Sequence, residues 1–217
     1  MRLLPLRLVC WLFELLYGPL APIYDWVSRV FFLGQWAHWQ RAALSEVSGR
    51  VLEVGAGTGA LQAEAVRRGL DWVALDRSPA MVRLARQRFH SLAPPTLLLA
   101  DATALPLKAG QVDWVVSTFP SAYIMAPATG KELARVLRPE GGIVVVLAGV
   151  LQPDGPLGWL LDQLHRLVLG SYEQLPSLPA PPGFSWQPRW VASPRGRALV
   201  LVGRRLERSP APAEDLR

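Results

Sequence analysis

Three acidic side chains stand at the ends of apolar runs, where a carboxylate can meet a ligand. Glu53 lies inside the first of these runs, Asp76 directly follows the second, and Asp101 closes the third. Carboxylates accept hydrogen bonds from hydroxyl and amine groups and attract cations. A ligand that is adenosine at one end and a cationic amino acid at the other satisfies all three acids. Asp76 is placed for the ribose hydroxyls, Asp101 for the exocyclic adenine amine and Glu53 for the cationic moiety.

A glycine turn at residues 55–59 follows Glu53, with glycine at alternate positions. Glycine permits a sharp strand-to-helix turn and leaves a backbone bare enough for a ligand to approach closely. A dinucleotide also fits such a turn, through the pattern G-x-G-x-x-A that starts at Gly55, with Asp76 near the spacing required for its ribose. Glu53 argues against that interpretation, because its charge would repel a pyrophosphate.

General bases and metal ligands are scarce in this sequence. The histidines are His38, His90 and His165, and a carbon or phenolic nucleophile would benefit from one of them as a general base. His38 and His165 lie in the two segments expected to cap the site, so they are the candidates, with a structural role as the alternative. The sequence contains no metal-binding cluster and no convincing catalytic triad, so we expect no metal and no nucleophilic side chain.

Apolar runs alternate with helical segments over residues 50–148. The runs cover residues 51–54, 72–75, 96–99, 112–117 and 143–147, and helices are expected over residues 60–68 and 79–89. Continuous apolar strands separated by helices indicate a parallel sheet covered on both faces. Two further strands, 185–192 and 198–204, flank a turn sequence and predict an antiparallel C-terminal hairpin. We therefore expect an α/β fold with a doubly wound, seven-stranded, mostly parallel sheet, whose ligands bind at the carboxyl ends of the strands.

The segments outside this alternation divide the chain into a cap, a main domain and a tail. We expect an N-terminal helical cap over residues 1–47 and the main domain over residues 48–206. Residues 151–184 are expected to be a cap insertion with a proline-rich connector, and residues 207–217 a disordered tail. Both caps are rich in Leu and Trp and are expected to cover an apolar ligand, although aromatic residues at helical spacing also suit a packed core.

The charge pattern limits the partners. The chain of 217 residues has 23 basic and 17 acidic side chains and a net charge of +6. The arginines do not cluster as in a nucleic-acid reader, so we expect no nucleic-acid partner. Six of them fall on two successive expected helices, where a solvated outer face explains them: Arg67, Arg68, Arg77, Arg83, Arg86 and Arg88. The single cysteine, Cys10, excludes a disulfide framework and fits a reducing compartment.

The N-terminal segment, residues 1–17, is apolar but contains Arg7 and Glu14, and Gly18-Pro19 breaks any helix beyond it. It is therefore a poor transmembrane span and a poor secretory signal. We expect a cytoplasmic protein. Its N-terminal helix either makes peripheral contact with the inner face of the membrane or packs over the ligand pocket.

Four ordered segments are similar to the motifs of one enzyme family. They are EVGAGTG at 53–59, LDRSPAM at 75–81, DATALPL at 101–107 and LARVLRPEGG at 133–142. Together they resemble the class I S-adenosylmethionine-dependent methyltransferases, and the match covers about residues 48–148. The resemblance implies a sheet of seven strands whose last strand is antiparallel, and S-adenosylmethionine as the cofactor.

The resemblance also implies roles for individual residues. Asp76 would hold the ribose, Met81 would pack near the adenine, and Asp101 with the Ala102 amide would bind the adenine edge. The full set of expected cofactor-binding residues is Glu53, Gly55, Ala56, Gly57, Gly59, Asp76, Arg77, Met81, Asp101, Ala102, Thr118 and Tyr24. For Tyr24 the alternative is a packed core tyrosine with a satisfied hydroxyl.

Within this family, Tyr24-Asp25, the aromatic cap and the Leu-Pro-Leu after Asp101 look most like the ubiquinone/menaquinone C-methyltransferases and the bacterial phospholipid N-methyltransferases. Residues 117–123 depart from the Gly-Leu-Arg-Asn continuation of the quinone group. We expect methyl transfer by positioning, to a small apolar or lipid-like acceptor such as a phospholipid headgroup or a quinone-like ring. The alternatives are an NAD-dependent oxidoreductase and a catalytically idle relative that binds the cofactor.

Overall fold

The structure is a computed structural model and describes residues 20–89, 96–152 and 183–206, together with residues 15, 155, 156, 158–160 and 163. Several expectations lie outside these residues. They concern the helix over most of residues 1–17, the histidines His90 and His165, most of the insertion at 151–184, and the tail at 207–217.

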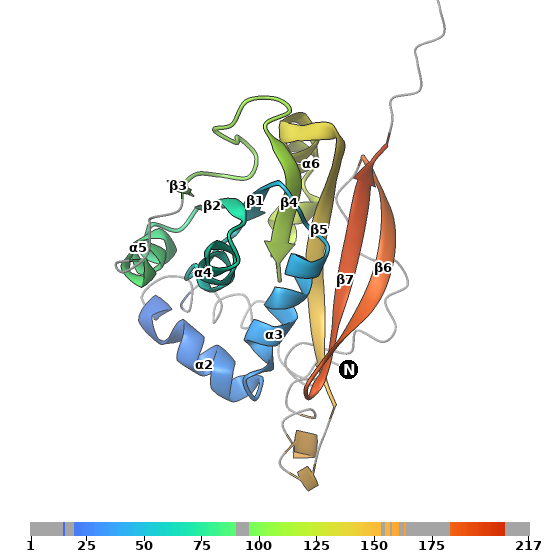
Figure 1. Ribbon diagram of the computed structural model, residues 1–217. Coiled ribbons are helices and arrows are strands. Elements are labelled where there is room, and N and C mark those ends of the chain that lie inside the picture. Colours follow the sequence, from blue (N-terminus) through green and yellow to red (C-terminus); the bar gives the residue numbers. More distant parts are fainter. Residues whose placement is uncertain are drawn as a thin grey trace, which may run out of the picture.

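Within the described residues, seven strands form one sheet in the order β3-β2-β1-β4-β5-β7-β6 (Figure 1). The strands are β1 (Arg50–Val54), β2 (Asp71–Asp76), β3 (Thr96–Leu99), β4 (Val112–Thr118), β5 (Leu137–Leu151), β6 (Phe184–Ser193) and β7 (Gly196–Arg205). The pairs from β3 to β5 are parallel, and β7 is antiparallel to both β5 and β6. The predicted mostly parallel sheet with an antiparallel C-terminal hairpin is confirmed. The strand order reverses between the parallel neighbours β1 and β4, because β2 and β3 lie on one side of β1 and β4 and β5 on the other. Such a reversal predicts a ligand crevice at the carboxyl ends of these two strands.

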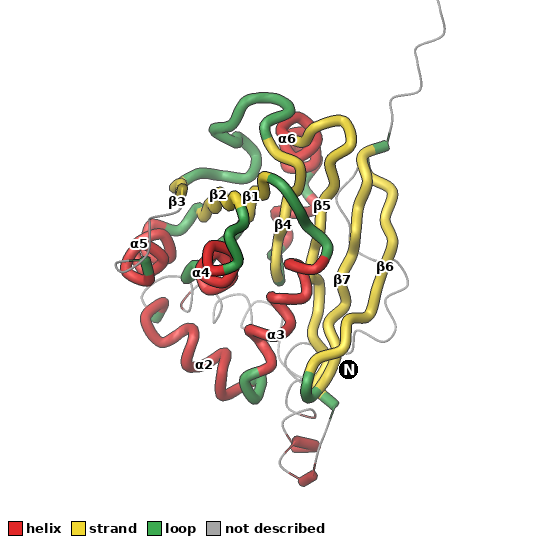
Figure 2. Tube along the Cα trace, viewed as in Figure 1, coloured by secondary structure: helices red, strands yellow, loops and turns green. Residues whose placement is uncertain are grey.

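Helices flank this sheet, as Figure 2 shows. The helices are η1 (Ala21–Ile23), α2 (Tyr24–Phe31), α3 (Gln35–Arg41), η2 (Ala42–Ser45), α4 (Ala60–Arg67), α5 (Pro79–Arg88), η3 (Ala122–Met125) and α6 (Pro127–Val136). Helix α5 begins as predicted, because the Ser78 hydroxyl accepts the Met81 N–H at 3.3 Å and Pro79 occupies the first turn.

Helix α6 and the length of β5 differ from the sequence-based expectation. The sequence pattern gives no signal for the helix at 127–136, where the poor helix formers Thr129 and Gly130 are buried within α6. The segment 138–142 has the composition of a turn, yet it lies inside β5. A Cβ on Gly142 would come within 2.5 Å of the Trp114 ring, so glycine is required there by close packing between β4 and β5.

Two hydrophobic cores lie on the two faces of the sheet, because alternate residues of a strand face opposite sides. On one face, Val51 of β1 belongs to the same core as Trp39 of α3 and Leu61 of α4. On the other face, Leu52 belongs to the same core as Leu133 of α6. The sheet is therefore covered on both faces, as the continuous apolar strands predict.

Trp39 fixes helix α3 on the sheet. Its ring is 1% exposed and lies directly on β5, where a Cβ on Gly149 would come within 2.1 Å of it. The Trp39 indole N–H donates to the Ser193 hydroxyl at 3.1 Å, and the Gln35 side-chain oxygen accepts the Arg195 amide at 3.0 Å. These contacts hold α3 against the hairpin and place its last turn near the end of β4.

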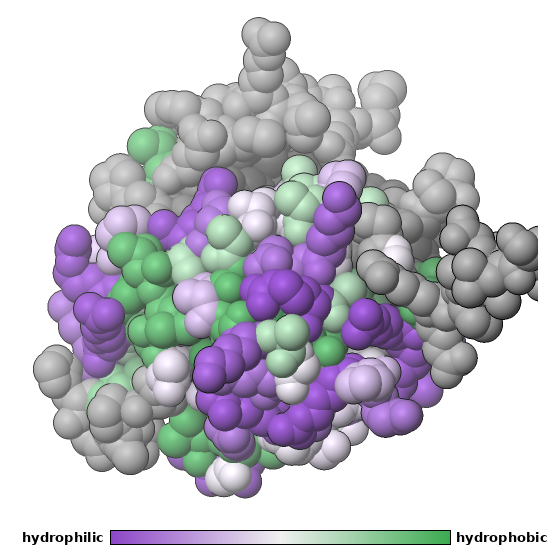
Figure 3. All heavy atoms as spheres, turned by 90° about the horizontal axis from the view of Figure 1, so that it is seen from above, coloured by the Kyte–Doolittle hydropathy of each residue, from purple (hydrophilic) through white to green (hydrophobic). Residues whose placement is uncertain are grey.

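Hydrophilic residues cover much of the described surface in Figure 3, with hydrophobic residues gathered in patches between them. The six arginines in and around α4 and α5 are all exposed, as predicted: Arg67, Arg68, Arg77, Arg83, Arg86 and Arg88. In the part of the chain that the structure describes, no helix has both the length and the hydrophobicity needed to cross a bilayer.

Candidate active site

The glycine turn joins β1 to α4 through three residues in the left-handed region. Gly55, Gly57 and Gly59 have φ angles of 78°, 55° and 73°, which other residues adopt only with strain. The amides of Gly55 and Ala56 donate to the Leu75 carbonyl at 2.9 and 3.0 Å and tie the turn to β2. A Cβ on Gly57 would meet no atom within 4 Å. At Gly57 the turn therefore offers bare backbone facing open space.

Asp76, the last residue of β2, holds the turn from the side. Its carboxylate accepts the Gly57 and Ser78 amides, each at 2.8 Å. Burial raises the pKa of Asp76, and the two amide bonds and the Arg77 charge oppose that rise. The carboxylate thus stands where the turn and β2 meet, with backbone donors on both oxygens.

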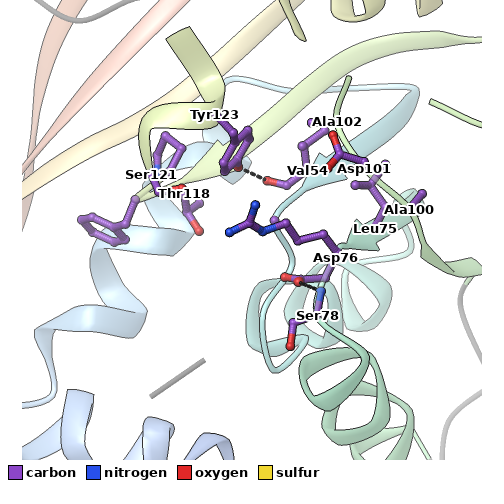
Figure 4. Close-up of a pocket in the computed structure, with 14 residues that line it drawn as sticks. Val54, Leu75, Asp76, Ser78, Ala100, Asp101, Ala102, Thr118, Ser121 and Tyr123 are labelled. Atoms are coloured by element: carbon purple, nitrogen blue, oxygen red, sulfur yellow. Dashed lines mark hydrogen bonds between the residues drawn. The ribbon is translucent and has the colours of Figure 1, made fainter. Parts of the chain in front are cut away.

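A cavity of about 360 Å³ opens beside this turn, at the carboxyl ends of the parallel strands (Figure 4). Its lining residues are Val54, Gly55, Leu75, Asp76, Arg77, Ser78, Ala100, Asp101, Ala102, Thr118, Phe119, Pro120, Ser121 and Tyr123. Six residues predicted to bind the cofactor are among them: Gly55, Asp76, Arg77, Asp101, Ala102 and Thr118. In Figure 4, Thr118 and Ser121 lie across the cavity from Ala100 and Asp101.

Asp101 reaches the cavity from the segment after β3. It is exposed, and its carboxylate accepts the Thr103 hydroxyl at 2.7 Å and the Thr103 amide at 2.8 Å. These two bonds hold the pKa of Asp101 below its usual value. The group is therefore an ionised hydrogen-bond acceptor at neutral pH, next to the buried Ala102.

Glu53 lies elsewhere. It is 1% exposed and does not line the cavity, and its carboxylate accepts the Trp72 indole N–H at 2.9 Å. Burial raises the pKa of Glu53 to about 8, the Trp72 bond opposes the rise, and the charge of Asp76 adds to it. The sequence position of Glu53 indicates a cationic ligand as its partner. In the structure its hydrogen-bond partner is the Trp72 indole.

Tyr24 and Met81, two of the expected cofactor-binding residues, belong to one hydrophobic cluster. Both are buried and pack together with Ala21, and neither lines the cavity. Ala56, Gly57 and Gly59 belong to the turn without lining the cavity.

Of the two histidine candidates, His38 lies on the exposed side of α3 and does not line the cavity. The structure therefore brings no described histidine to the cavity wall.

A hydroxyl cluster at the end of β4 was not predicted. The buried Ser117 donates to the Val54 carbonyl at 2.8 Å, and the Tyr123 hydroxyl lies 2.8 Å from Ser117 and 3.1 Å from that carbonyl. Tyr123 also stands over the turn, since a Cβ on Gly55 would come within 2.7 Å of its oxygen. Their position in the chain could have indicated them, because Ser117 is near the end of β4 and Tyr123 follows it, next to the point where the strand order reverses.

Helix α2 is tied to the same turn. Asp25 accepts the Thr58 hydroxyl at 2.8 Å and pairs with Arg88 of α5, and the Arg88 side chain also donates to the Thr58 carbonyl at 2.9 Å. Of the Tyr24-Asp25 pair, Asp25 is therefore the residue that contacts the glycine turn and helps to hold it in place.

Comparisons with known proteins fit this geometry. A family model described as a methyltransferase domain matches residues 51–141. A demethylmenaquinone methyltransferase from Thermus thermophilus is 32% identical over 190 residues, which cover 76% of this chain and 86% of the relative. The chain belongs to the class I S-adenosylmethionine-dependent methyltransferases.

Two further matches agree with the assignment as a methyltransferase. A demethylmenaquinone methyltransferase from Renibacterium salmoninarum is 33% identical over 135 residues, covering 60% of this chain. The chain spans only 56% of that relative's length. The crystal structure of an S-adenosylmethionine-dependent methyltransferase from Thermotoga maritima matches with a TM-score of 0.58 at 20% identity, over 89% of this chain and 99% of that one, and shows that the fold is shared.

The residues of the site fit S-adenosylmethionine, the cofactor of this family. The bare turn at Gly57 leaves room for a ligand to lie on the backbone. The buried Asp76 carboxylate lies in the cavity wall, as a ribose would require, and Asp101 and Ala102 line the same wall beyond it. These residues could hold the cofactor.

Proposed function

We propose that this protein transfers the methyl group of S-adenosylmethionine to a small apolar acceptor with a quinone-like ring. The observation that carries the proposal is one cavity that joins Gly55 and Asp76 to the apolar side chains of Phe119 and Pro120. Relatives named demethylmenaquinone methyltransferases support a quinone-like acceptor. A phospholipid headgroup is the second candidate.

The cofactor, when bound, supplies a methyl group already activated on its sulfonium. The chain's own residues then have to bind, orient and exclude water. Asp76 would accept hydrogen bonds from the ribose hydroxyls, and Asp101 with the Ala102 amide would bind the adenine edge. The glycine turn would admit the amino-acid end, and the segment from Thr118 to Tyr123 would face the acceptor.

Calorimetric titration with S-adenosylhomocysteine and with NAD tests this function. We expect S-adenosylhomocysteine to bind and NAD not to bind, because the carboxylates that line the cavity, Asp76 and Asp101, would repel a pyrophosphate. Binding of NAD alone would overturn the proposal in favour of an oxidoreductase. Transfer of label from S-adenosylmethionine to the quinone fraction of a membrane extract then distinguishes an enzyme from an idle relative.

We also propose that the protein is cytoplasmic and makes peripheral contact with the inner face of the membrane through residues 1–17. The next described segment supports this, because four large apolar side chains around α2 are exposed: Leu20, Ile23, Trp26 and Val30. Trp26 is 67% exposed, and aromatic residues favour the membrane interface. A net charge of +6 favours an anionic surface.

Sedimentation with anionic liposomes at low salt tests the membrane contact. The full chain is expected to sediment in part with the liposomes, and deletion of residues 1–17 should reduce the bound fraction. The control is the same mixture with zwitterionic liposomes, which lack the attracting charge. A full-length protein that stays in the supernatant with anionic liposomes at low salt would contradict the proposal.

A further inference from the structure

We propose that Phe119 and Thr118 form the acceptor subsite and select an aromatic ring that carries an oxygen substituent. The Phe119 ring would be the flat wall on which the acceptor lies, and the Thr118 hydroxyl would donate to the ring oxygen. The inference rests on the proposed methyltransferase function and names the residues that would hold the ring of its acceptor and select for its oxygen substituent.

Phe119 adopts a backbone conformation that bulky residues rarely adopt. Its φ is 49°, in the left-handed region, where a large side chain is a genuine outlier. The Phe119 amide donates to the Val146 carbonyl of β5 at 2.7 Å, which holds this conformation. Such outliers cluster at ligand sites, where the surrounding structure maintains them. Here the outlier directs an aromatic side chain to the cavity wall at the end of β4.

A stack of rings fixes the plane of the Phe119 side chain. Its ring lies on Trp36 with centroids 3.9 Å apart and planes 21° apart, and Trp36 in turn lies on Phe32 at 4.8 Å and 24°. Trp36 belongs to α3, which Trp39 anchors on the sheet. One side of Phe119 is therefore covered by Trp36, and the ring lines the cavity from a fixed position. A planar ring can continue such a stack, whereas a flexible aliphatic headgroup cannot.

Thr118 stands directly before this wall and lines the same cavity. Its hydroxyl oxygen accepts the Gln40 side-chain amide at 3.3 Å. Because Gln40 supplies the donor of that bond, the hydroxyl hydrogen of Thr118 can be donated to an acceptor oxygen. The sequence pattern assigned Thr118 to the cofactor, and its position beside Phe119 assigns it to the acceptor.

Charge at the cavity favours a phenolic ring over the amine of a phospholipid headgroup. The lining carboxylates are Asp76 and Asp101, and both belong to the adenosine end. Near Phe119 the described lining side chains are the apolar Pro120 and the hydroxyl of Ser121. An ammonium group would find no carboxylate there, whereas a ring hydroxyl would find uncharged hydrogen-bonding partners.

Steady-state kinetics with 2-prenyl-1,4-naphthohydroquinone, kept reduced under nitrogen, tests the subsite. Phe119→Leu should raise KM for the hydroquinone about threefold to tenfold, as expected for loss of one aromatic contact. Thr118→Val, which keeps the shape and removes the hydroxyl, should lower kcat/KM by a similar factor. Both variants should bind S-adenosylhomocysteine with unchanged affinity in calorimetry, because neither change touches the adenosine end.

Phe32→Leu is the matched control, since Phe32 belongs to the same stack but does not line the cavity. It should lower the melting temperature and leave KM for the hydroquinone unchanged. The inference is overturned if Phe119→Leu and Phe32→Leu change KM equally, or if the protein methylates phosphatidylethanolamine vesicles but not the hydroquinone. A wild-type protein that fails to bind S-adenosylhomocysteine would overturn the proposed function itself, and the subsite with it.

Discussion

Asp76→Asn is expected to weaken binding of S-adenosylhomocysteine by about 10-fold to 100-fold. The carboxylate would accept hydrogen bonds from the ribose hydroxyls, and bonds to a charged group contribute about 1.5–3 kcal/mol. The change also leaves only one acceptor oxygen for the Gly57 and Ser78 amides, which both donate to the native carboxylate. Isothermal titration calorimetry of the variant measures the loss directly.

Asp71→Asn is the matched control for this experiment. Asp71 opens the same strand, and its side chain is 64% exposed, 3.8 Å from Arg50. The control variant should bind S-adenosylhomocysteine like the wild type, because Asp71 lies at the opposite end of β2 from the cavity. Equal affinities for the Asp76→Asn variant and the control would show that Asp76 is not a cofactor ligand.

Glu53→Gln is expected to stabilise the protein increasingly as the pH rises. In the native state the pKa of Glu53 is raised to about 8 from an ordinary value of 4.5. The unfolded chain therefore ionises this group at lower pH than the native chain does. The protonated Glu53 carboxyl therefore stabilises the native state fully below pH 4.5, and this contribution to the unfolding free energy is lost as the pH rises through about 8.

The difference in unfolding free energy between the variant and the wild type should therefore grow by on the order of 3 kcal/mol from pH 5 to pH 9. Any constant cost of burying the glutamine amide cancels in this comparison. Urea-induced unfolding at the two pH values measures it, and Glu140→Gln, at an exposed carboxylate, is the control. A pH-independent difference would show that Glu53 ionises normally in the native state.

The same Glu53→Gln variant also tests the cofactor role that the sequence position indicates. If Glu53 interacts only with the Trp72 indole and not with the cofactor, the affinity of the variant for S-adenosylhomocysteine should equal that of the wild type. A loss comparable to that of Asp76→Asn would show that Glu53 acts on the cofactor after all.

Local sequence determined most of the fold. The apolar runs at 51–54, 72–75 and 96–99 predict β1, β2 and β3 closely, since buried parallel strands need continuous apolar residues. The hairpin follows from its turn residues. Helix α6 and the full length of β5 could not be read in this way, because their weak helix formers and turn-like residues are held by tertiary packing.

The residues of the site also differ in whether the sequence alone could predict their place. By itself the sequence determined the glycine turn, and it placed Asp76 and Asp101 at strand ends, because strand ends and left-handed glycines follow from residue order alone. Only the tertiary structure decided that Glu53 meets Trp72 and that Phe119 stacks on Trp36. Alternation along a strand tells which residues share a face, but partners far apart in the chain are chosen by how the cap and the sheet pack together.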